Sequence, residues 1–189
     1  MMKYQGKPYV VKEELKRRFK PGDFVFVSDM LDLFGDWVLT ECISDVFNVI
    51  RGFPETQFLF LTKNPKRYFY LEDALPQNCV LGCTIESNEN YCLGFSPSQT
   101  DRLRWMEAMN DILVKYRRFI SVEPILNFDV ERFANALLNA KPWAVAVGYD
   151  NYGNKLEEPP LAKTLLLIEI LKKAGIKVYK KTLRERWNQ

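Results

Sequence analysis

The sequence of 189 residues contains no histidine. This absence excludes Ser-His-Asp and Cys-His hydrolysis, zinc sites built on histidine, and a histidine general base. Any acid–base chemistry in the chain must therefore use carboxylates, lysine, tyrosine or cysteine.

Long apolar runs are absent as well. No stretch approaches the roughly 20 apolar residues that span a bilayer, and the first residues, MMKYQ, lack the apolar core of a secretory signal. We therefore expect a cytoplasmic protein with no membrane partner. The net charge of +3 is mild. It allows an anionic ligand but does not by itself require nucleic acid.

Cysteine is scarce, with four residues: Cys42, Cys79, Cys83 and Cys92. Reduced cysteines in a cytosolic protein are commonly small buried hydrophobes, and we expect this role here. The alternative is that the C-x3-C-x8-C spacing of the last three ligates a metal or cluster. We expect no metal site.

The chain does contain a regular alternation of strand and helix patterns. Short β-rich apolar runs occupy residues 24–27, 58–61, 80–85, 118–122, 143–147 and 176–179. Helix-period segments separate most of them, including residues 12–20, 38–53 and 103–113, and another helix is expected to begin with Asn64 as N-cap before Pro65. This alternation predicts an α/β fold with a parallel sheet and right-handed crossovers. We expect one domain over residues 1–189, a partial (β/α) barrel of about six parallel strands with outer helices. An open doubly wound sheet is the alternative.

Most of these strands end in a hydroxyl followed by a charged residue. The strand-end groups are Ser28-Asp29, Thr62-Lys63, Thr84 with Glu86, Ser121 with Glu123, and Tyr149-Asp150 after Gly148. Ligands of parallel α/β proteins bind where the carboxyl ends of the strands meet. The sequence therefore predicts one shared site at this edge of the sheet.

Residues two apart on a strand share a face, so Thr84 should point the same way as Glu86, and Ser121 the same way as Glu123. Two carboxylates facing one cavity repel, which raises the pKa of one and makes it a proton donor or a ligand clamp. The alternative is that both bind backbone amides at helix starts. Lys63, directly at a strand end, is the candidate for binding an anion.

Four phrases of the sequence also resemble a known family. They are VSDMLDLF at residues 27–34, LTKNP at 61–65, LGCTIE at 81–86 and SVEPIL at 121–126. In order and approximate spacing, over residues 24–179, they are similar to segments of the phage Gp37/Gp68-like family. That family is a radical S-adenosylmethionine-related group near the spore photoproduct lyases.

The resemblance implies a partial barrel that binds S-adenosylmethionine at its strand tips. It assigns Ser28 and Asp29 to the cofactor's amino group, and Thr84, Glu86, Ser121 and Glu123 to its ribose and carboxylate. Tyr149 is a further candidate for binding a hydroxyl-bearing ligand, with a turn role as the alternative.

The chain departs from this family in its cysteines. Radical enzymes of this type hold a 4Fe–4S cluster on a C-x3-C-x2-C motif that precedes the segment matching residues 24–30, and residues 1–23 contain no cysteine. We therefore expect no cluster on this chain alone and a barrel without its first strand. A split gene, a degenerate copy or a truncated product would each explain the difference.

Two main hypotheses follow, together with a weaker third. In the first, a cluster-less relative keeps a cavity for S-adenosylmethionine or a nucleotide-like ligand and works alone or with a complementary chain. In the second, an independent enzyme uses Glu86 and Glu123 as acid and base and Lys63 to bind an anionic substrate. The third, prompted by the repair relatives and the basic residues 180–187, is nucleic-acid binding.

The expected loss of the first strand leaves residues 24–27 at an open edge, which proteins usually cover or pair. We therefore expect residues 1–20 to fold back over this edge, or a complementary chain or a second copy in a homo-oligomer to dock there.

Overall fold

The computed structural model describes residues 8–187 except 29, 92 and 93. Within these residues the structure has six strands and five α-helices. The strands are β1 (Phe24–Phe26), β2 (Gln57–Thr62), β3 (Cys79–Thr84), β4 (Arg117–Val122), β5 (Ala144–Val147) and β6 (Lys177–Lys180). The helices are α1 (Thr40–Arg51), α2 (Lys66–Tyr70), α3 (Gln99–Ala108), α4 (Val130–Asn139) and α5 (Leu161–Lys173), with short 3₁₀ turns η1 (Glu14–Lys16) and η2 (Glu72–Ala74).

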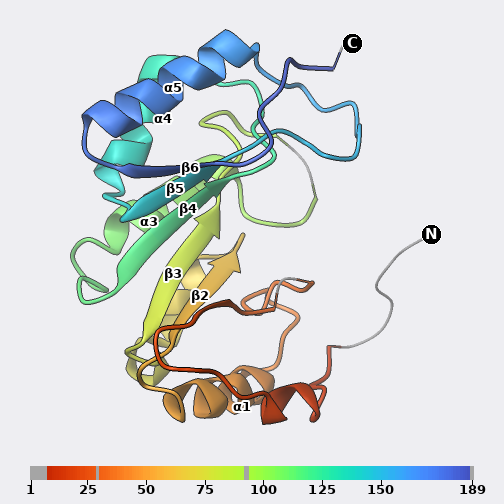
Figure 1. The fold of residues 1–189 in the computed structure, drawn as a ribbon, viewed down its shortest axis with the longest axis vertical. Helices are drawn as coiled ribbons and strands as arrows, with labels where there is room; N and C mark the ends of the chain where they lie inside the picture. The colour runs from red at the N-terminus through yellow and green to blue at the C-terminus, as the bar shows by residue number, and fades with distance from the viewer. Residues whose placement is uncertain (1–7, 29, 92–93, 188–189) are drawn as a thin grey trace.

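All neighbouring strands pair in parallel, and their order in the sheet is their order in the chain, from β1 to β6. The sheet curls into a half-barrel with helices around it, as Figure 1 shows. The predicted partial (β/α) barrel is thereby confirmed. A helix follows each of the first five strands, so all strand carboxyl ends lie at one edge of the sheet.

The convex face of the sheet holds the main core. Phe47 of α1 packs on Phe60 of β2, with ring centroids 5.6 Å apart, and Phe34 lies against the same two rings and against Tyr68. In Figure 1, α1 lies below the sheet while α4 and α5 cover its upper part. Apolar residues at helical spacing therefore cover the outer face of the sheet, and the alternate strand residues face the inner side of the half-barrel.

Strand alternation decides which side chains reach that inner face. Thr84 pairs with Ser121 across β3 and β4, and Leu61 pairs with Gly82 across β2 and β3. A side chain at Gly82 would meet the Phe60 carbonyl oxygen at 2.5 Å and both flanking leucines at 3.2 Å. This position therefore requires glycine, because the inner face is crowded beside β2.

Some helix predictions were wrong in extent. Of residues 12–20 only the turn η1 is helical, and α3 ends at Ala108, before the apolar residues that were expected to extend it to 113. The side chain of Asn64 does not cap α2. Its amide instead donates to the Phe34 carbonyl at 3.0 Å and to an oxygen of Asp36 at 2.8 Å. Tertiary hydrogen bonds outweigh the local preference in this case.

The segment before β1 is described only from residue 8, so the expectation that residues 1–20 cover the open edge stays a prediction. Phe19 makes edge-on contacts with Phe53 and Phe58, with centroids 5.1 and 5.2 Å apart, so it packs on the outer side of β2. Within residues 8–187, apart from the three undescribed positions, no strand lies beyond β1. In the same part of the chain no helix is both long and apolar enough to cross a membrane.

The crowding at Gly82 gives a first prediction. The substitution Gly82→Ala should lower the free energy of unfolding by about 1–3 kcal/mol, because the added methyl group forces β2 and β3 apart. Urea denaturation followed by circular dichroism measures the change. Gly52→Ala is the matched control, since it has an ordinary helical φ of −71° and a single near contact at 3.1 Å. Equal stability of the two variants would contradict the close approach.

Candidate functional site

A fully buried carboxylate lies at the carboxyl end of β3. Glu86 is 0% exposed. The Lys63 ammonium is 2.7 Å from its Oε1, and the Arg102 guanidinium is 3.0 Å from its Oε2. The Gln99 amide donates to the same Oε2 at 3.4 Å. A buried charge of this kind is tolerated only when it is paired and hydrogen-bonded, and Glu86 has both kinds of partner.

Arg102 is the less expected member of this group. It lies on α3, is 2% exposed, and donates to the Thr84 carbonyl at 2.6 Å and to the Pro97 carbonyl at 2.9 Å. Its guanidinium therefore joins the end of β3, the loop before α3 and Glu86. The planar fork of arginine suits several acceptors at once, which a lysine could not serve in the same geometry.

Lys63 approaches Glu86 from the end of the neighbouring strand, and its backbone is hydrogen-bonded to Asp32. The Lys63 backbone N–H donates to Asp32 Oδ2 at 2.8 Å, and Asp32 Oδ1 accepts the N–H of Phe34 at 3.0 Å. The Asp32 carboxylate thus accepts hydrogen bonds from two backbone N–H groups and links the loop after β1 to the turn after β2. The Lys63 side chain is 39% exposed, so it is the part of the ion pair that solvent or a ligand can reach.

Several polar side chains near this ion pair have no partner in the described chain. Neither the hydroxyls of Ser28, Thr84 and Ser121 nor the carboxylate of Glu123 makes a hydrogen bond or ion pair with any of residues 8–187 whose placement is described. Thr84 and Ser121 are only 8% and 6% exposed. Buried polar groups usually find partners, so these hydroxyls are the groups most suited to contact a ligand.

A hollow of about 240 Å³ lies beside these groups. It is lined by Phe26, Ser28, Met30, Leu31, Asp32, Leu61, Thr62, Lys63 and Thr84, which come from the ends of the first three strands and the loop after β1. Ser28 has φ of 57°, in the left-handed region that costs a non-glycine residue energy. Such strained positions cluster at ligand sites.

Glu123 directly follows β4, the strand that pairs with β3. Its carboxylate approaches Gly148 at the end of β5, where an added Cβ would lie 3.3 Å from Glu123 Oε1 and 2.7 Å from Lys181 Cβ. The structure thus brings Lys63, Glu86 and Thr84 together and places Ser121 and Glu123 on the next strand along the same edge.

Tyr149 lies elsewhere. It is fully buried, and its hydroxyl donates to the Pro159 carbonyl at 3.0 Å and shares a hydrogen bond with Thr164 at 2.7 Å. Its polar group is therefore occupied by the start of α5. The candidate Asp29 lies outside the described residues.

The residues that the sequence analysis missed are Arg102 and Gln99. Both lie on α3, whose apolar pattern is weak and gives no sign that a charged residue points inward. The one available signal was indirect. A buried glutamate at a strand end requires a cation, and α3 is the helix that follows it.

The cysteines of the described chain do not fit an iron–sulfur cluster. Cys79 and Cys83 point into the apolar core, and Cys42 lies on α1. Burial raises the pKa of the Cys79 thiol to about 12 and raises that of Cys83 as well, which opposes the thiolate that a cluster requires. Among the described residues no three His, Cys, Asp or Glu side chains group in a way that could hold a metal ion. Cys92 lies outside them.

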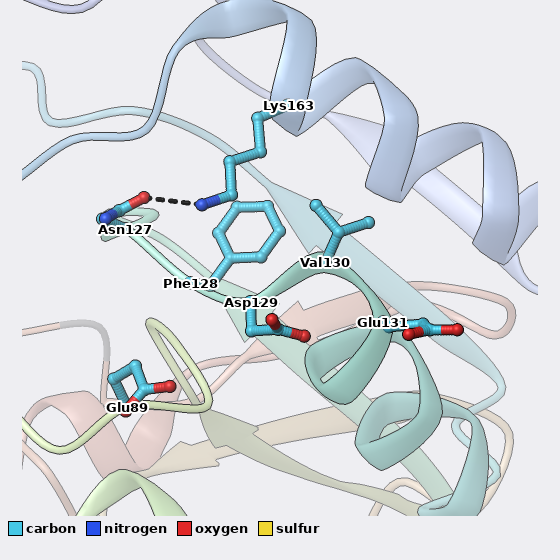
Figure 2. A pocket seen from close by; sticks show the side chains of 7 residues that line it. All are labelled: Glu89, Asn127, Phe128, Asp129, Val130, Glu131 and Lys163. Atoms are coloured by element: carbon cyan, nitrogen blue, oxygen red, sulfur yellow. Dashed lines mark hydrogen bonds between the residues drawn. The ribbon is translucent and has the colours of Figure 1, made fainter.

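A second, larger hollow of about 610 Å³ lies outside the strand ends, at the start of α4 and α5. Figure 2 shows its lining residues, among which Lys163 donates to Asn127 at 2.8 Å and lies over the Phe128 ring. The acids Glu89, Asp129 and Glu131 complete it, and Asp129 caps α4 through the Arg132 N–H at 2.8 Å. The hollow's lysine and one of its acids thus already serve the protein's own structure.

The fold and site together define a curled α/β half-barrel with a polar rim at its strand carboxyl ends. Residues 4–157 match the model of a family described as a protein family of unknown function (DUF5131), and the chain belongs to this family.

The structure is also similar to that of a spore photoproduct lyase mutant with bound AdoMet and dinucleoside spore photoproduct. The TM-score is 0.52 at 13% identity, over 86% of this chain and 49% of that chain. A second similar structure is that of Streptococcus suis SuiB, with a TM-score of 0.46 at 14% identity and the same coverage. Comparison with curated proteins gave no match.

This chain therefore spans about half the length of the solved structures it resembles. The likeness to the lyase extends to the fold, which agrees with the scaffold that the sequence resemblance implied. The phage-family name suggested by the four phrases stays a prediction.

The buried ion pairs give a second prediction. The substitution Arg102→Met should destabilise the protein by about 3–5 kcal/mol, because Glu86 would keep its charge but lose one of its two cations. In the double variant Glu86→Gln/Arg102→Met most of this loss should be recovered, since no buried unpaired charge remains and the Lys63 side chain is 39% exposed. Urea denaturation of the four proteins of this cycle measures both effects.

Arg104→Met is the matched control, because Arg104 lies on the same helix with a side chain 80% exposed and a surface contact of 3.7 Å to Asp101. Such a pair contributes about 0–1 kcal/mol. If Arg102→Met costs no more than Arg104→Met, the account of Glu86 as a buried, doubly paired charge is incorrect.

Proposed function

We propose that the rim of the half-barrel binds S-adenosylmethionine or a similar nucleoside-containing ligand. The observation that carries this proposal is the set of unpartnered polar groups on successive strand ends. Ser28, Thr84, Ser121 and Glu123 each present an oxygen that no described residue binds, beside the Lys63–Glu86 ion pair and the hollow. Hydroxyl and carboxylate oxygens are suitable partners for ribose hydroxyls and an amino group.

The arrangement gives each end of such a ligand a suitable partner. The exposed ammonium of Lys63 can take the ligand's carboxylate while Arg102 continues to neutralise Glu86. The carboxylate of Glu123 can take the amino group or a ribose hydroxyl. Bound S-adenosylmethionine supplies an activated sulfonium for group transfer or for reductive cleavage. The fold likeness to a lyase described with bound AdoMet supports this choice of ligand.

We further propose that a second polypeptide completes the site. The hollow of about 240 Å³ is smaller than the roughly 300–1,000 Å³ of typical ligand pockets. It opens beside β1, which is the outermost strand of the sheet, and both Phe24 and Phe26 are about half exposed there. A complementary chain or a second copy paired with β1 would deepen the hollow and cover the Phe26 ring that lines it.

An independent enzyme without this ligand is the second candidate. Its specific support is Glu123, the rim carboxylate that has no cation partner in the described chain and is therefore available to take or give a proton. Glu86, with a cation on each oxygen, acts in this scheme as the group that holds Lys63 in place.

Calorimetric titration with S-adenosylmethionine tests the first proposal. The wild-type chain should bind the ligand, and the double variant Thr84→Val/Ser121→Ala should bind it about tenfold more weakly, because two hydrogen bonds of about 0.5–1.5 kcal/mol each are lost. Ser44→Ala, on the exposed side of α1, is the control and should not change the affinity. Flat titrations with S-adenosylmethionine, S-adenosylhomocysteine and ATP alike would rule the proposal out.

A separate prediction concerns iron. Anaerobic reconstitution of this chain with iron and sulfide should give no stoichiometric 4Fe–4S absorption, because Cys79 and Cys83 are buried in the core and the sequence has no C-x3-C-x2-C motif. The measurement is the visible spectrum together with iron analysis after desalting. A stable brown protein with about four irons per chain would show that the description of the cysteines is wrong.

A further inference from the structure

A cluster of cations and aromatic rings is centred on the amino ends of the strands. It comprises Phe24 at the start of β1, Arg117 at the start of β4, Trp143 just before β5, and Lys177 and Tyr179 on β6. We call these five residues the floor cluster. Phe24, Arg117 and Lys177 begin their strands and Trp143 precedes β5, whereas Tyr179 is the third residue of β6 and pairs with Ala146, which is level with Ser121 of the rim.

The contacts of the floor cluster centre on Trp143. The Arg117 guanidinium carbon lies 4.6 Å from the centroid of the Trp143 ring, the Lys177 ammonium lies 5.5 Å from it, and the Phe24 ring centroid lies 6.2 Å from it. Lys177 also lies 4.9 Å from the centre of the Tyr179 ring. Phe24 belongs to the first strand and Tyr179 to the last, so the curl of the sheet brings its two ends into one surface.

The two cations of the cluster have no acidic partner. In the described parts of the chain, neither Arg117 nor Lys177 forms an ion pair with a carboxylate, whereas other surface cations such as Lys173 and Arg17 do. Both side chains are exposed. Their charge is therefore balanced by ring faces and solvent alone, which leaves it available to an anion.

The rings of the cluster are accessible too. Phe24 is 50% exposed and Tyr179 is 39% exposed, although both lie on strands where burial would be expected to remove apolar surface. A flat exposed ring next to an unpaired cation fits a ligand that offers a planar base and a phosphate in alternation. An acidic peptide would use the cations and leave the rings exposed, and a duplex would keep its bases stacked out of their reach.

From these observations we propose that the floor cluster binds single-stranded nucleic acid, with bases stacking on Tyr179 and Phe24 and phosphates bound by Arg117 and Lys177. Proteins that bind single strands without sequence preference combine these two elements, aromatic platforms and a cationic groove. The proposal goes beyond the rim's function and does not depend on it, because its two phosphate-binding cations, Arg117 and Lys177, begin their strands, whereas the rim hydroxyls lie at the carboxyl ends.

Fluorescence anisotropy with a labelled oligothymidylate tests the proposal, with a labelled oligouridylate, a duplex of the same length and polyglutamate as comparison ligands. Both single strands should bind at low salt, and binding should weaken steeply between about 50 and 200 mM salt. A difference between the two single strands distinguishes DNA from RNA as the preferred ligand. The duplex and polyglutamate should bind more weakly than either.

Variants assign the binding to the floor cluster. Arg117→Gln/Lys177→Gln should reduce the magnitude of the slope of log affinity against log salt by about 1.4, because each phosphate contact on a single strand contributes about 0.7. Tyr179→Leu should weaken binding by at least about fivefold through the loss of one base stack. The control Arg132→Gln/Lys172→Gln removes the same charge from the outer helices α4 and α5 and should leave the slope unchanged.

The outcomes separate this proposal from the alternatives. Equal losses in the floor and control variants would show that binding is only a response to net charge, and equal binding of polyglutamate would show that the rings play no part. A lower melting temperature of the floor variant with unchanged binding would mean that the cluster only closes the sheet. If the double variant does not fold, Lys177→Gln alone, at an exposed edge-strand position, should lower the slope by about 0.7.

Calorimetry with S-adenosylmethionine keeps the two proposals distinguishable. Arg117→Gln/Lys177→Gln should bind that ligand as the wild type does, because both residues begin their strands and lie away from the rim hydroxyls. If the wild-type chain does not bind the single-stranded oligonucleotides, the floor proposal alone is overturned. If its titration with S-adenosylmethionine is flat, the rim proposal alone is overturned.

Discussion

The buried carboxylate of Glu86 sets the main constraint on the strand-end edge of this protein. Removing a carboxylate from water costs several kcal/mol unless cations and donors replace the water. Here the replacements come from three directions: Lys63 from the end of β2, Arg102 from α3, and Gln99 from the first turn of the same helix. The positions of two strand ends and one helix are therefore coupled through a single charge, and Asp32 extends this coupling to the loop after β1.

This constraint explains why the rim can leave other polar groups free. Because the ion-pair network already holds β2, β3 and α3 in place, Thr84, Ser121 and Glu123 need not make structural hydrogen bonds. The alternation of side chains along each strand then determines which face of the sheet a residue occupies. Side chains such as Cys83 and Ile85 face the core, while the residues between them face the inner side of the half-barrel. The same alternation places Tyr149 with the core and leaves Gly148 next to Glu123.

Much of this could be predicted from the sequence. Continuous apolar runs separated by helix-period segments were sufficient to predict six parallel strands and a partial barrel, because few other folds are compatible with that pattern. The pairing of Lys63 with Glu86 was not predicted, since it depends on the register of two strands that are distant in the chain. Nor was Arg102, because a buried cation on a weakly amphipathic helix has no periodic signal. Tyr149 was proposed as a ligand-binding residue because it follows a strand. The alternation of side chains along β5 instead directs it into the core. Asn64 was chosen as a helix cap, but it binds the loop after β1 instead.

The central claim is that the open oxygens around the Lys63–Glu86 pair form a ligand site at the carboxyl ends of the strands. Backbone NMR during titration with S-adenosylmethionine tests it most directly, since each amide reports its own surroundings. The account predicts that the largest chemical-shift changes fall on Ser28, Lys63, Thr84 and Gly148, with little change on the outer faces of α4 and α5. Changes confined to the outer hollow around Asn127 and Lys163, or none at all, would contradict it.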